Sequence, residues 1–80
     1  MSGGPRLAES EPGLVAMEWP TEDIDPDFQT LDAHAALMAV ARRHAQRLGA
    51  RPGMGAATVY TVQREYGEAF RFVWGREDAT

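Results

Sequence analysis

Residues 30–49, TLDAHAALMAVARRHAQRLG, predict one amphipathic helix, and this single helix constrains the fold more than any other feature. Asp25 or Thr30 offers an N-cap, while Gly49 and Pro52 end the helix. Advancing about 100° per residue, the inward apolar residues fall within an arc of about 120°; they are Leu31, Leu37, Met38, Ala41, Ala45 and Leu48. A lone helix with one apolar stripe has to lie on another element, and the neighbouring segments predict what that element is.

Three segments predict strands. Residues 14–19 are apolar and stop at a proline, which is typical of a short strand near a sheet edge. Residues 58–64 and 69–74 alternate with period two around a turn that contains glycine. We therefore expect a β-α-β-β domain, in which a right-handed crossover makes the first two strands parallel if they are neighbours.

The register of the C-terminal hairpin has two solutions. A bulge at Gly67 would place Tyr60 and Val62 beside the aromatic face of the last strand. A strict two-residue turn would place Val59 and Thr61 there instead. We take the first as the expected register.

The expected fold class is α+β: a single small domain, β-α-β-β, with one amphipathic helix packed on a three-stranded sheet with a C-terminal β-hairpin. Residues 1–12 are rich in glycine and proline and predict a flexible N-terminal tail. The domain is expected to span residues 13–76, with residues 77–80 as a C-terminal tail. The absence of an apolar leader and of any long apolar run predicts a cytoplasmic protein.

The residue types present disfavour an enzyme. The chain has no cysteine, which excludes disulfides, zinc-thiolate sites and cysteine nucleophiles. Its only serines, Ser2 and Ser10, lie in the expected tail, where no base can orient them. His34 and His44 are ten residues apart and cannot share a metal on one helix. We expect no catalytic residue, no metal and no cofactor; a small metal protein or enzyme that uses either histidine is the alternative.

The two histidines have different expected environments. Helical geometry puts His34 at the centre of the apolar arc, where burial would favour its neutral form. His44 falls at the edge of the arc. We therefore expect one packing histidine, His34, and one boundary histidine, His44.

Charge is distributed unevenly along the chain. Residues 7–41 contain eight acids and no base, whereas residues 42–76 contain seven arginines and two acids. The acids could imitate a phosphate backbone and occupy the basic groove of a nucleic-acid-handling protein. Direct binding of nucleic acid is disfavoured by the formal net charge of −4 and by the lack of a binding motif.

Protein binding is the function that this layout favours, through the acidic surface or through a sheet edge. In size and layout alone the chain resembles small phage-encoded inhibitors such as anti-CRISPR proteins, and this resemblance implies an inhibitor or modulator of a protein partner. We expect no direct nucleic-acid contact, no membrane contact and a possible homodimer. A structural subunit or homodimeric assembly protein is the alternative. The expected partner-binding residues are Glu18, Trp19, Glu22, Asp23, Asp25, Asp27, Arg43 and Arg47.

Overall fold

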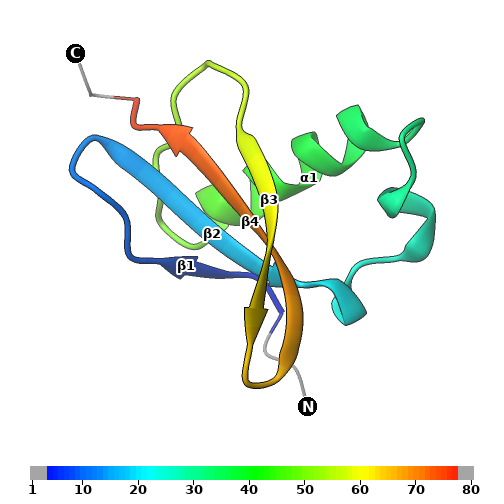
Figure 1. Cartoon of the computed structure of the whole chain (residues 1–80). Coiled ribbons are helices and arrows are strands. Elements are labelled where there is room, and N and C mark those ends of the chain that lie inside the picture. Colours follow the sequence, from blue (N-terminus) through cyan, green and yellow to red (C-terminus); the bar gives the residue numbers. More distant parts are fainter. Residues whose placement is uncertain (1–3, 78–80) are drawn as a thin grey trace.

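The computed structural model describes residues 4–77, which form a small α+β fold with one α-helix and a four-stranded antiparallel sheet (Figure 1). The strands are β1 (Arg6–Ala8), β2 (Leu14–Pro20), β3 (Thr58–Arg64) and β4 (Gly67–Gly75). Between β2 and β3 lie two short 3-10 helices and the α-helix: η1 (Thr21–Asp23), η2 (Pro26–Gln29) and α1 (His34–Arg47). α1 lies across one face of the sheet, behind it in the view of Figure 1.

The three-stranded sheet expected from the sequence is wrong, because β1 adds a fourth strand at the edge beside β2. β1 arises from the segment expected to be a tail, where Leu7 pairs with Met17. A strand of three residues is too short to show period-two alternation, so it gives no signal in the sequence. The sheet order is β1-β2-β4-β3. β4 therefore lies between β2 and β3 and pairs antiparallel with both. β2 and β3 run parallel to each other, but they are not neighbours in the sheet.

The hairpin adopts the two-residue turn, so the register with a bulge at Gly67 is wrong. Val59 pairs with Phe72 and Thr61 pairs with Phe70, which puts Tyr60 on the face away from α1. The charge of Arg64 explains the choice. In the bulged register this side chain would face the apolar core, whereas in the observed register it reaches a carboxylate on the open face.

The core lies between α1 and the two central strands. Met17 and Trp19 of β2, with Phe72 and Trp74 of β4, are buried against the helix. Phe72 and Trp74 are stacked, with ring centroids 6.0 Å apart. On the helix, the buried residues are Leu37, Ala41 and Ala45. The small alanine side chains let the helix backbone approach the aromatic layer closely, which suits a small core.

The helix starts later than the apolar arc predicts. Its first residue is His34, and Leu31 lies in the preceding turn with a relative exposure of 95%. Thr30 caps this turn by accepting a hydrogen bond from the backbone N–H of Ala33. Asp25 caps η2 instead of the helix, because its side chain accepts from the N–H of Asp27. The arc therefore loses its first member, and Leu48 at the other end is also exposed.

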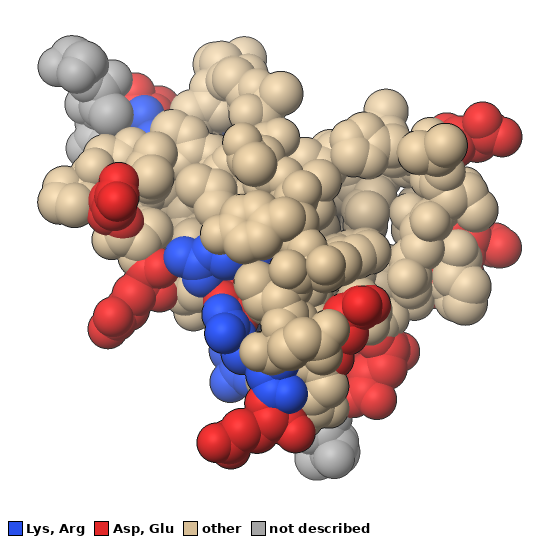
Figure 2. All heavy atoms as spheres, viewed as in Figure 1, with Lys and Arg blue, Asp and Glu red and all other residues tan. Residues whose placement is uncertain are grey.

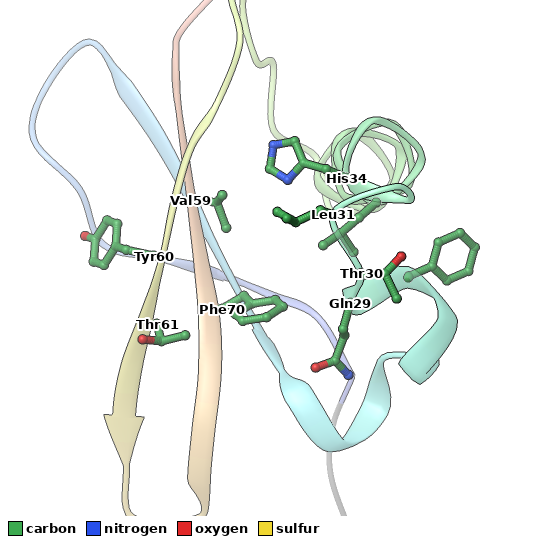
Figure 3. A pocket seen from close by; sticks show the side chains of 10 residues that line it. Gln29, Thr30, Leu31, His34, Val59, Tyr60, Thr61 and Phe70 are labelled. Atoms are coloured by element: carbon green, nitrogen blue, oxygen red, sulfur yellow. The ribbon is translucent and has the colours of Figure 1, made fainter.

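The structure places His44 at the boundary of the core, as expected, but it does not bury His34. His34 is exposed, because it projects from the first turn of α1 toward a gap beside β3 that no side chain fills (Figure 3). The expectation of a buried His34 is therefore wrong. His44 is half-buried and packs edge-on against Trp19, with ring centroids 4.8 Å apart. Burial against this ring, and secondarily the positive charge of Arg47, lower the pKa of His44 from its ordinary value of 6.5.

Among residues 4–77, no helix is both long and apolar enough to cross a membrane.

Replacing Phe72 by alanine tests the core. Phe72 is fully buried, so we expect Phe72→Ala to lower the free energy of unfolding by about 3–5 kcal/mol. Such a loss is a large fraction of the roughly 5–15 kcal/mol typical of a domain. Urea denaturation followed by far-UV circular dichroism measures it. The matched control Leu31→Ala should change stability by no more than about 0.5 kcal/mol, and equal losses in the two variants would contradict this packing.

The environment of His44 predicts how stability depends on pH. Its folded pKa lies below the unfolded value of 6.5, so the unfolded state binds the proton more readily. The contribution to stability is complete above pH 6.5 and is lost as the pH falls from there through the folded pKa. An NMR titration should give His44 a midpoint below 6.5. A midpoint at or above 6.5 would show that the ring does not pack on Trp19 in solution.

Candidate protein-binding site

The outer edge of β3 is the longest unpaired strand edge in the described part of the chain. β3 pairs with β4 along all seven of its residues, and its other side meets no described strand. The opposite edge of the sheet is β1, which has only three residues and follows Pro5. Exposed backbone N–H and C=O groups on an edge strand can pair with an added strand. β3 is therefore the better of the two edges for this.

An open apolar cleft of about 240 Å³ runs beside this edge. Val59 and Phe70 form its sheet side, and Phe28, Leu31 and Leu37 form the side of the helix and its preceding turn. In Figure 3, Val59 and Phe70 point toward Leu31 and His34, whereas Tyr60 points to the opposite face of the sheet. Leu31 is 95% exposed, so its side chain is available to contact an apolar group that enters the cleft.

The far wall of the cleft is held in place by its own hydrogen bonds. The Gln29 amide nitrogen donates to the carbonyl oxygens of Thr21 and Ile24, at 3.1 and 3.0 Å, and so joins η2 to η1. The Thr21 hydroxyl donates to the carbonyl of Glu68, which ties η1 to the start of β4. Ile24 is buried between them. The wall is therefore ordered without a ligand, which reduces the entropy lost on binding.

Acidic residues follow this wall. Residues 21–41 contain five acids and no lysine or arginine. Figure 2 shows acidic side chains on the right-hand side of the molecule, where η1, η2 and the start of α1 lie, and others on the left and at the bottom. No basic side chain is visible on the right-hand side in this view. The acids of the wall are Glu22, Asp23, Asp25, Asp27 and Asp32.

None of the eight expected partner-binding residues lines the cleft itself. The four acids of residues 22–27 lie in the segment of η1 and η2, of which Phe28 and Gln29 reach the cleft. Asp23 also accepts a hydrogen bond from the backbone N–H of Gly4 at 3.2 Å, so it is partly engaged within the fold. Arg43 and Arg47 are exposed near the other end of α1. At about 1.5 Å per residue they lie roughly 14–20 Å along the axis from His34, the first helical residue, so they do not share a surface with the acids.

Trp19 and Glu18 are both buried, with relative exposures of 7% and 6%. Trp19 belongs to the core. Glu18 lies on the open face, where Arg64 binds both carboxylate oxygens, at 2.7 and 2.5 Å. Arg71 donates to the same carboxylate at 2.6 Å and to the backbone carbonyl of Glu9 at 2.7 Å. These residues form an internal ion cluster that spans three strands.

The ion cluster keeps Glu18 charged. Hydrogen bonds from Arg64 lower the pKa of Glu18 from its ordinary value of 4.5, although burial acts in the opposite direction. The hydrogen bond from Arg71 and the positive charges of both guanidinium groups add to the lowering. The buried carboxylate is thus satisfied within the fold and serves the structure of the sheet.

The sequence reasoning missed the residues that line the cleft. The signal for them was the β-branched alternation of residues 58–62, which we used only to predict a strand. A second signal was an apolar Leu31 placed before the helix, which we counted as core. Within the described residues, no three histidine, aspartate or glutamate side chains come together in a way that could hold a metal ion.

Comparison of the chain with known protein families, with characterised proteins and with solved structures finds no match.

The Glu18 cluster predicts acid sensitivity of the fold. Its folded pKa lies below 4.5, so its contribution to stability is present above that pH and is lost as the pH falls through the folded pKa. We expect wild type to be more stable than Glu18→Gln at pH 7 and this difference to shrink between pH 5 and pH 3. Urea unfolding of both proteins at each pH measures it. A difference that does not vary with pH would show that Glu18 is not an ionised partner of the arginines.

Proposed function

We propose that this chain is a small non-enzymatic protein-binding module that modulates its partner by pairing with an extended segment of it along β3. The observation that carries the proposal is the seven-residue unpaired edge directly beside an apolar cleft. Main-chain hydrogen bonds to a strand edge supply affinity, and pockets for alternate side chains supply specificity. Both features are present at β3.

Strand geometry explains how the two features would work together. A segment added to β3 would lie about 4.8 Å from it, and its side chains would alternate between the two faces of the sheet. Those on the side of α1 would enter the cleft between Val59 and Leu31. Small-molecule sites are usually about 300–1,000 Å³, and this open cleft of about 240 Å³ suits one or two side chains of a peptide better.

A segment of the partner that is paired with β3 could not make its other contacts. The module would inhibit its partner in this way. We propose a cytoplasmic nucleic-acid-handling protein as the partner, because the acidic wall suits the basic surfaces of such proteins. The same β3 edge could instead join two copies of the chain, as in a homodimeric assembly protein. The experiment below separates the two cases.

Selection from a displayed library of random twelve-residue peptides tests the proposal. The immobilised full chain should enrich peptides with apolar residues at alternate positions, and NMR should locate their binding at Val59, Thr61 and Leu31. Leu31→Asp should weaken the selected peptides at least about tenfold, because it removes an apolar contact worth roughly 1.5–3 kcal/mol when buried.

Met54→Asp is the matched control, because Met54 is 93% exposed and does not line the cleft. It should leave affinity within about twofold. Equal effects of the two substitutions, or binding on the face of Tyr60, would contradict the proposal. Sedimentation showing a dimer held by β3 in the absence of peptide would favour the homodimer.

A further inference from the structure

We infer that the segment received by β3 is a basic one: an extended stretch of a partner protein that carries lysine or arginine around apolar anchor residues. This inference rests on the proposed function and adds the chemistry of the partner to it. Three features of the described residues support it: the charge of the cleft wall, the hydrogen bonds of three arginines, and the exposed tyrosine on the other side of β3.

The segment that borders the cleft is acidic in sequence. Its five acids stand in a stretch of twenty-one residues with no lysine or arginine. Glu22, Asp25 and Asp27 are exposed. An apolar cleft beside carboxylates attracts a partner in which basic side chains flank the anchor, and the field also speeds association.

Three arginines of β3, β4 and the helix, namely Arg64, Arg71 and Arg42, donate hydrogen bonds within the fold. Arg64 points to the open face and binds Glu18 through two hydrogen bonds. Arg42, on the helix, donates to the carbonyl of Pro52 at 2.9 Å and so holds the loop before β3. These hydrogen bonds direct these two guanidinium groups elsewhere than Glu22, Asp25 and Asp27, which are exposed and available to a basic partner.

Tyr60 offers a contact for a basic side chain on the face of the sheet away from α1. The residue is 46% exposed on the open face of β3, opposite Arg71 of β4, and the alternate side chains of an added strand would pass on its other side. A guanidinium or ammonium group over a tyrosine ring is a favourable contact. The chain already makes one such contact, with the Arg6 guanidinium carbon 5.1 Å from the centroid of Tyr66.

A second copy of the chain is a poorer occupant than a basic segment. Two copies joined edge to edge at β3 would present the same patch to each other, so each would bring its own acidic wall to the contact. The chain has a formal net charge of −4, which adds to the repulsion. Charge complementarity therefore favours a partner of opposite sign.

Three synthetic peptides test the sign of the charge directly on the full chain. All carry valine and leucine at alternate positions, and the intervening positions hold lysine, glutamine or glutamate. In 20 mM buffer we expect the lysine peptide to bind about tenfold more tightly than the glutamine peptide, and the glutamate peptide to bind most weakly. At 1 M salt, where the screening length is about 3 Å, the spread should fall to about twofold.

Two charge-matched variants separate local from global electrostatics. Glu22→Gln with Asp27→Asn removes two charges from the wall and should weaken the lysine peptide by about threefold or more. Glu9→Gln with Glu11→Gln removes two charges from the connection between β1 and β2 and should change it by less than about 1.5-fold. Equal effects of the two pairs would overturn the inference, because the attraction would then follow net charge alone.

The remaining outcomes distinguish this inference from the proposed function. Equal binding of all three peptides would overturn the basic partner and leave strand pairing intact. Failure of all three to bind, together with an unenriched library, would overturn the proposed function itself. A lysine peptide with alanine in place of valine and leucine that binds as tightly as the original lysine peptide would show that the attraction does not need the cleft. A dimer that forms through β3 without peptide would show that a second copy occupies this edge. Either result overturns the inference.

Discussion

The arrangement of the sheet depends on one buried carboxylate. Glu18 comes from β2, and its partners Arg64 and Arg71 come from β3 and β4, so one ion cluster spans three of the four strands. Because side chains alternate between faces, a shift of one residue in either pairing would turn an arginine into the apolar layer under α1. The cluster therefore favours one register of the sheet, and that register decides which side chains of β3 meet the cleft.

The cleft follows from a mismatch between the helix layer and the sheet. Four strands at about 4.8 Å spacing span roughly 14 Å between the outer strand axes, whereas a helix with its side chains is about 10–12 Å wide. α1 packs on Met17, Trp19, Phe72 and Trp74, all from the central strands. The strip over β3 is left uncovered, and the turn with Leu31 borders it without filling it.

Local patterns in the sequence were enough to predict the helix, three strands and the aromatic face of residues 70–74, because each rests on periodicity within one segment. What failed depends on contacts between distant segments. The strand at Leu7 exists only because β2 offers it an edge, and the hairpin register depends on Arg64 reaching a carboxylate 46 residues away. The prediction that His34 is buried was wrong, because helical geometry identifies the inward face of the helix but does not show where the opposing sheet ends. The cleft also depends on contacts between distant segments, because its two sides come from residues 28–37 and 59–70.

The inequality of the two sheet edges limits assembly. A sheet with two long free edges can add strands at both ends and grow without a stopping point, which is the route to fibres. Here β1 offers three residues next to a proline, whose nitrogen has no hydrogen to donate, while β3 offers seven. Growth by strand addition would thus proceed from one side only and stop after a single step. A complex formed by strand addition at β3 would then have a defined stoichiometry and would not polymerise.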